Sequence, residues 1–134
     1  MVMRNCFSAA LAAAISLALV SPASGADERV TRAKDLYRSA AYDEALALLE
    51  TVPAEASSAD AVAAYEYRVF CLVALDRKDD AKRAIATLVA ADPSYQMPEA
   101  QSPRLRALFT EVRRAVLPSV VHRAYADAKA AFDR

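Results

Sequence analysis

Two stretches of sequence decide the fold: YDEALALLE at residues 42–50 and KDDAKRAIA at residues 78–86. Each has acidic residues at its second and third positions, which the positive end of a helix dipole favours. Each then places apolar residues three and four positions apart, which is the spacing of one helix face. The alignment sets Ala45 over Ala81, and in both stretches a larger aliphatic residue follows four positions later. Because a small residue allows close helix packing, the sequence predicts two repeated units about 36 residues apart.

Helical spacing of apolar residues continues along the rest of the chain, and nothing resembles a half-buried strand. A first helix precedes residue 42. Its stripe consists of Val30, Ala33, Leu36 and Tyr37. A third helix, running to about Leu75, is apolar nearly all round, as expected of a helix packed on two sides. Prolines at 93 and 98 end the fourth helix, and Ser102 before Pro103 is a typical helix start. The predicted fold class is all-α, an α-α superhelix of helix hairpins.

The repeated unit resembles the tetratricopeptide repeat, a helix pair of about 34 residues. The matching residues are Ala33, Leu36, Tyr42 and Ala45 in the first unit, and Tyr65, Leu72, Ala81 and Asp92-Pro93 in the second. The resemblance implies two such hairpins over residues 27–100, in a right-handed array that binds protein or peptide partners. The family usually has glycine in the turn within the repeat, where this chain has Ala40 and Asp76. Because alanine tolerates a left-handed backbone poorly, we expect the first turn to be distorted.

The remaining segment, residues 101–134, combines an added helix with a returning motif. Its beginning resembles the run that often follows such repeats in bacterial cell-envelope proteins. Leu117-Pro118 is expected to interrupt the helix, and a further helix follows with its apolar residues facing inward. Those residues are Val121, Ala124, Tyr125, Ala128 and Phe132. Because they repeat the pattern of the first helix, we interpret this helix as the first of a partial further repeat in a truncated protein. A terminal capping helix is the alternative.

The first 26 residues have the features of a signal peptide. Arg4 precedes an uncharged apolar run from Phe7 to Val20, and small residues at Ser24 and Ala26 suit signal peptidase. The apolar run is 14 residues long, whereas a membrane-spanning helix needs about 20. We therefore expect cleavage after Ala26 and a periplasmic or secreted protein. An uncleaved inner-membrane anchor is the alternative.

Composition argues against several classes of function. The chain carries 17 Lys plus Arg and 17 Asp plus Glu, whereas binding to nucleic acid needs a strongly basic surface. Its one glycine, Gly25, lies in the predicted signal peptide, so the rest of the chain cannot form a glycine-rich phosphate loop. Cys71 is the one cysteine after that segment, and we interpret it as a small buried residue. Residues 27–66 hold 9 acids and 4 bases, whereas residues 101–134 hold 3 acids and 7 bases. The two ends of the chain therefore have opposite charge, and head-to-tail contact between copies is a further option.

No arrangement of residues predicts catalysis or metal binding. His122 is the only histidine, and Asp127, five residues later, lies about 140° around the helix from it. The acid pairs at residues 43–44 and 79–80 stand at helix starts, where the helix dipole explains them. We therefore predict a protein that is not an enzyme and that uses no cofactor or metal.

The predicted function is a non-catalytic scaffold or adaptor that mediates protein–protein interaction. Candidate contacts on the inner face of the first and third helices are Lys34, Arg38, Glu66 and Tyr67. Of the positions that clamp a peptide carboxylate in some tetratricopeptide domains, only Lys34 is suitable. The alternative function is a signal-anchored envelope protein whose C-terminal helices contact anionic lipid or an acidic partner through Arg106 and Arg113. Since about three units are normally needed for stability, we also expect marginal stability or self-association.

Overall fold

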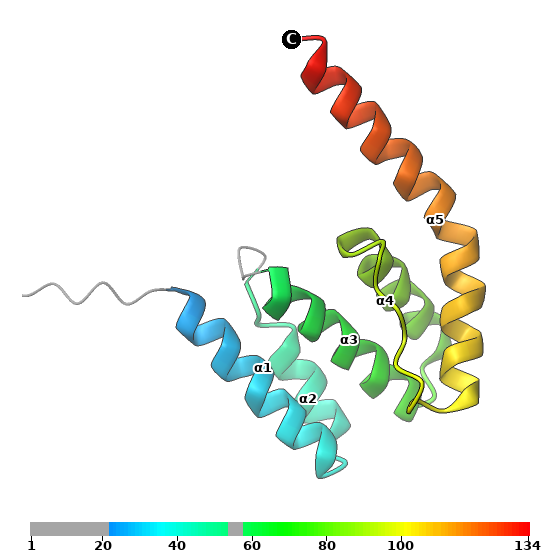
Figure 1. Cartoon of the computed structure of the whole chain (residues 1–134). Coiled ribbons are helices and arrows are strands. Elements are labelled where there is room, and N and C mark those ends of the chain that lie inside the picture. The colour runs from blue at the N-terminus through cyan, green and yellow to red at the C-terminus, as the bar shows by residue number, and fades with distance from the viewer. Residues whose placement is uncertain (1–21, 54–57) are drawn as a thin grey trace, which may run out of the picture.

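A computed structural model describes residues 22–53 and 58–134, and in these two ranges the chain forms five helices and no strand. The helices are α1 (Pro22–Arg38), α2 (Tyr42–Leu49), α3 (Ser58–Ala74), α4 (Lys78–Ala91) and α5 (Pro103–Phe132). The first two form one hairpin, α3 and α4 form the next, and the first half of α5 packs on α4 (Figure 1). The α1 helix also contacts α3. The prediction of an all-α fold made of helix hairpins is confirmed.

Most of the predicted signal peptide, residues 1–21, lies outside the described residues. The predicted cleavage position after Ala26 falls inside α1, where Ala26 is fully buried.

The two hairpin turns have the same backbone geometry. Ala40 has φ of 60° and Asp76 has φ of 55°. Each of these residues donates its N–H to the carbonyl three positions back, at 3.0 and 3.1 Å. The residue after each donates to the carbonyl five positions back, at 2.9 Å in both turns. This pair of bonds defines the Schellman motif, which satisfies the last carbonyls of a helix. The expected distortion of the first turn is therefore wrong, because this pair of bonds forms with Ala40 in the left-handed conformation.

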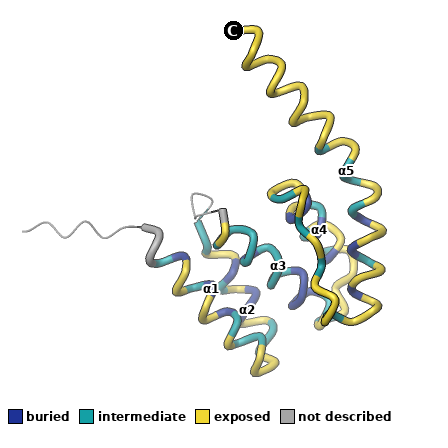
Figure 2. The backbone as a smooth tube through the Cα atoms, in the orientation of Figure 1, coloured by how far each residue is buried: buried dark blue, intermediate teal, exposed yellow. Residues whose placement is uncertain are grey.

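Two clusters of buried side chains form the core (Figure 2). The first joins α1, α2 and α3 to the start of α4, and it contains Ala45 and Ala81, both with no exposed surface. The second joins α3 and α4 to α5, with Ile85 fully buried and Phe109 nearly so. Cys71 is buried and unpaired, which confirms its interpretation as a small core residue. The alanines that align 36 residues apart in the sequence thus both lie where helices approach closely.

The α5 helix begins as predicted but does not end as predicted. The side chain of Ser102 caps it by accepting a hydrogen bond from the Leu105 N–H at 3.3 Å, with Pro103 as the first helical residue. The expected interruption at Leu117-Pro118 is wrong, because Pro118 lies inside one helix of 30 residues. Proline removes a backbone hydrogen bond and bends a helix, and Figure 1 shows α5 changing direction near its middle. The helix continues past Pro118 because the following residues are rich in alanine, the strongest helix former.

The second half of α5 projects from the body, and we call its residues 118–132 the arm. Every residue after Val120 is exposed, including Val121 at 55%, Tyr125 at 69% and Phe132 at 91%. The prediction that these side chains face inward is therefore wrong. Inward burial needs a neighbouring element, and in the described part of the chain the packing on α4 stops before the arm.

Candidate partner-binding face

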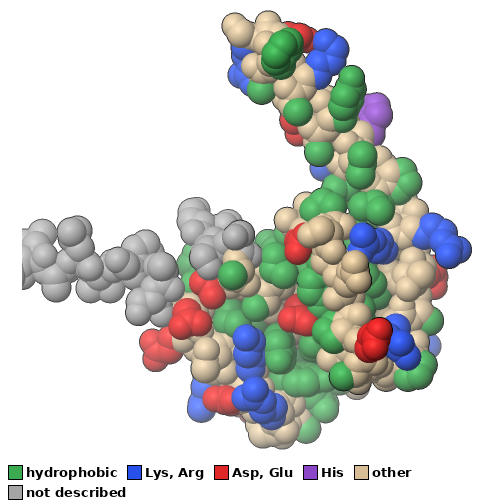
Figure 3. Space-filling view, viewed as in Figure 1, with side chains coloured by type: hydrophobic (Ala, Val, Ile, Leu, Met, Phe, Trp, Pro, Cys, Tyr) green, Lys and Arg blue, Asp and Glu red, His purple; other side chains and the backbone are tan. Residues whose placement is uncertain are grey.

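The α1 and α3 helices lie next to each other and share one face of the molecule. Lys34 places its Nζ 5.5 Å from the ring centroid of Tyr67, which is within the range of a cation–π contact. The Tyr67 ring packs edge-on against Tyr37, with centroids 5.5 Å apart, and against Phe70, at 5.4 Å. Figure 3 shows hydrophobic side chains between these helices and basic side chains over α1. Two of the four predicted contacts, Lys34 and Tyr67, are thus brought together.

The loop after α4 closes one side of this face. Tyr95 donates its hydroxyl hydrogen to Glu66 Oε1 at 2.7 Å. Burial, followed by the hydrogen bond to that carboxylate, raises the pKa of Tyr95 well above its usual value. Glu66 also borders a hollow of about 520 Å³ between the first half of α3 and the end of α4, with Val62 beside it. Sequence reasoning missed Tyr95, for which the available signal was an aromatic residue in a loop between two prolines.

Arg113 positions that loop. Its guanidinium donates to the backbone carbonyl oxygens of Tyr95 and, at 2.9 Å, of Pro93. The Tyr95 ring in turn packs edge-on against Phe109, with centroids 5.7 Å apart. Arg113 therefore links α5 to the loop and holds the loop in place beside the face. The sequence had instead suggested that Arg113 contacts anionic lipid or an acidic partner.

Arg38 and Arg106 lie apart from this set. Arg38 forms an ion pair with Asp35 within α1, at 2.8 Å, and both side chains are more than half exposed. Arg106 lies on the outward side of α5, where it borders a shallow hollow together with Thr110 and Arg114. An exposed ion pair of this kind contributes little to stability, so Arg38 remains available to a ligand.

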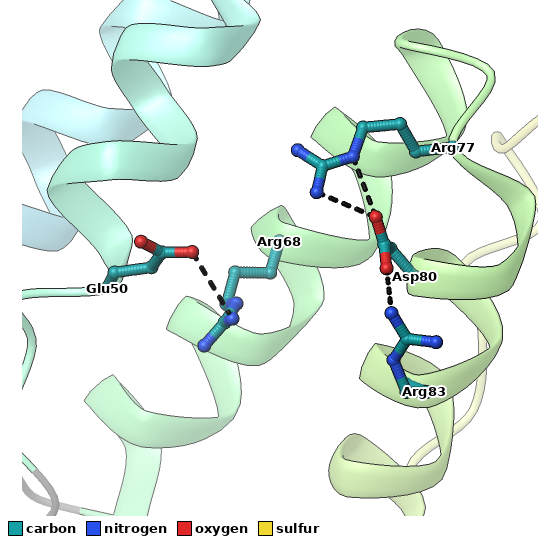
Figure 4. A network of polar contacts seen from close by, with 5 residues as sticks. All are labelled: Glu50, Arg68, Arg77, Asp80 and Arg83. Atoms are coloured by element: carbon teal, nitrogen blue, oxygen red, sulfur yellow. Dashed lines mark hydrogen bonds and ion pairs between the residues drawn. The ribbon is translucent and has the colours of Figure 1, made fainter.

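A second group of charged residues lies across α2, α3 and α4, and sequence reasoning missed it (Figure 4). Arg68 approaches Glu50 at 3.6 Å. Arg77 donates to one carboxylate oxygen of Asp80 at 2.8 Å, and Arg83 bonds the other oxygen. The hydrogen bond from Arg77, helped by both positive charges, holds the pKa of Asp80 below its usual value. These residues line a hollow of about 220 Å³. The Arg68–Glu50 pair joins α3 to the end of α2, whereas the two bonds to Asp80 lie within α4 and its N-cap.

No group of three or more His, Cys, Asp or Glu among the described residues is placed to hold a metal ion. No helix in the described ranges is long and apolar enough to cross a membrane. A scan against family models, a search of curated proteins and a search of solved structures give no match.

Proposed function

We propose that the chain is a non-catalytic scaffold of the tetratricopeptide type that binds a protein or peptide segment in the periplasm or outside the cell. The repeat supports this: the two hairpins have the same turn 36 residues apart, and buried alanines stand at the same register in α2 and α4. Stacked hairpins of this kind form an extended surface that suits an extended or helical peptide. The signal-like segment at residues 1–26 supports the location.

The observation that carries the binding proposal is the contact between Lys34 and Tyr67. It places a cation and an aromatic ring side by side on a face that is hydrophobic between α1 and α3. The Glu66–Tyr95 bond fixes the neighbouring edge, so the face is organised before a ligand arrives, which lowers the entropy cost of binding. A peptide that suits it carries an acidic group for Lys34 and an apolar or aromatic side chain for Tyr67.

The test is selection of peptides from a random phage-displayed library against the purified protein, followed by affinity measurement on its variants. We expect enriched peptides that carry an acidic residue and lose affinity on Lys34→Glu, by about tenfold, as for loss of a charge pair at an interface. Lys78→Glu is the matched control, since Lys78 is an exposed lysine at the start of α4. Peptides that bind both variants equally would refute the assignment of this face.

Contact with anionic lipid is the second candidate function, and Arg106 and Arg114 are the residues that favour it. Both are exposed on the outward side of α5, whereas Arg113 is bonded to the loop after α4. Flotation with vesicles that contain phosphatidylglycerol tests it. Binding that weakens with salt and disappears on joint Arg106→Glu and Arg114→Glu substitution would support lipid contact.

A further inference from the structure

The hollow of about 220 Å³ between α2 and α4 has a net positive charge. Both of these helices pack on α3, so α3 forms the floor of the hollow and the other two helices form its walls. More guanidinium groups than carboxylates border it, and a positively charged hollow attracts anions. The charged residues are Arg68 on the floor, Glu50 after α2, and Arg77, Asp80 and Arg83 along the start of α4.

The hollow does not overlap the α1–α3 face. The residues of α3 that line it are Tyr65, Arg68 and Leu72, which are three and four positions apart and therefore lie on one side of the helix. At about 100° per residue, Glu66 and Tyr67 lie on the opposite side of α3. What the hollow binds is thus independent of the proposed function.

Arg68 is the unsatisfied group of this site. Its side chain is 36% exposed, and its ion pair with Glu50 Oε1 spans 3.6 Å, which is longer than a hydrogen bond. Its Nε is buried and has no hydrogen-bond partner. Within the described residues, no group accepts a hydrogen bond from this guanidinium. Because a largely buried cation without an acceptor is costly, such a group indicates a bound water or ion.

The two arginines of the α4 wall also keep donors for a further acceptor. Arg77 bonds Asp80 Oδ2 through Nε at 2.8 Å and through Nη2 at 2.6 Å, and Arg83 Nη2 bonds the other carboxylate oxygen (Figure 4). A guanidinium group has five N–H donors, so these bonds leave N–H groups of both arginines unused. One carboxylate also cannot neutralise two guanidinium charges, and this wall of the hollow therefore stays positive.

We propose that the hollow binds a single oxyanion group, a phosphate or a carboxylate, with Arg68 as the residue that holds it. The planar guanidinium matches the paired oxygens of both groups. At about 30 Å³ per water molecule, the hollow has room for about seven waters, whereas pockets for drug-sized ligands measure about 300 to 1,000 Å³. The site therefore suits one small group, which either a free ion or an acidic side chain of a partner supplies.

Titration with inorganic phosphate, followed by proton–nitrogen NMR, tests the proposal on protein expressed from the complete sequence and purified in its native processed form. The Nε–Hε signal of Arg68 is expected to shift in a saturable way, because the guanidinium gains an acceptor. Sodium chloride at the same ionic strength is the reference for general screening of charge. The signal of Arg32, which is exposed on α1, should respond equally to both salts.

Two substitutions separate binding from a purely structural role of Arg68. Arg68→Gln removes the charge that holds the anion and should weaken phosphate binding by about tenfold or more, read from the backbone amides around the hollow. Glu50→Gln removes the competing carboxylate and should strengthen binding by about threefold or more. Both substitutions break the same ion pair, so a structural role would give them effects of the same sign. Arg32→Gln is the matched control and should bind as the native protein does.

A capped tetrapeptide that contains two glutamates, titrated in the same way, identifies the source of the oxyanion. Saturable shifts with phosphate assign the site to a free ion, and shifts with the peptide alone assign it to an acidic side chain of a partner. Shifts no larger than those of chloride with either probe would overturn the proposal. Equal binding by the native protein and by Arg68→Gln would overturn it as well, because the anion would then bind elsewhere.

Discussion

Replacement of Ala81 by leucine tests whether close approach of the helices holds the hairpins together. Ala81 has no exposed surface, and it lies in the cluster that joins α1, α2 and α3 to the start of α4. A larger side chain there forces displaced rotamers or a backbone shift, which destabilises a protein by about 1 to 3 kcal/mol. This is a large part of the total stability of a small domain, which is about 5 to 15 kcal/mol. Because each kcal/mol lowers the Tm of a domain of this size by about 5 °C, the Tm should fall by about 5 to 15 °C.

Urea unfolding followed by circular dichroism measures this change. Ala90→Leu is the matched control, because it makes the same replacement in the same helix at an exposed position, where we expect a change within about 0.5 kcal/mol. The midpoint should shift while the dependence on urea stays constant, as for a change in stability alone. Equal effects of the two substitutions would refute the reasoning, since Ala81 would then not lie in a tightly packed contact.

The remaining predictions each concern a single residue. Ala40→Gly should stabilise the protein by about 1 kcal/mol in urea unfolding, because glycine adopts a positive φ without strain. Tyr95→Phe removes the hydrogen bond to Glu66 and should lower the free energy of unfolding by about 1 to 2 kcal/mol in the same assay. Burial raises the pKa of the Cys71 thiol to about 11, so its reaction with a thiol reagent at neutral pH should require unfolding. Because the unfolded thiol ionises first, Cys71 should also make stability fall as pH rises from about 8.5 towards that value. Pro118→Ala restores a backbone donor and should slow hydrogen exchange of the arm's amides.

Each of these has a contrary result and, where the chain offers one, a control. Ala47→Gly, at an exposed position within α2, should destabilise where Ala40→Gly stabilises, and destabilisation by both would contradict the turn geometry. An unchanged stability of Tyr95→Phe would show that the bond to Glu66 contributes nothing. Rapid modification of Cys71 in the folded protein would contradict its burial. If Pro118→Ala leaves the hydrogen-exchange rates of the arm's amides unchanged, the bend of α5 lies elsewhere.

Most of the helical framework was predictable from the sequence. Helix faces depend on residues three and four positions apart, so the stripes of α1 to α4 were visible without a structure. The cap at Ser102 was predictable because the bond it makes is local. The α1–α3 face was partly predictable: Lys34 and Tyr67 follow from the positions of two helices in neighbouring hairpins. Tyr95 and Arg113 were not assigned their roles, because a loop folding back on α3 and α5 leaves no periodic signal.

The sequence by itself determined the order of the helices, the 36-residue register and the small residues at Ala45 and Ala81, because these depend on local spacing and on side-chain size. Only the tertiary structure decided that Ala40 takes the left-handed conformation, that α5 continues through Pro118 and that the stripe beyond it stays exposed. The physical reason is that a periodic pattern of apolar residues indicates only that a helix has an apolar face. Whether another element reaches that face depends on the path of the whole chain.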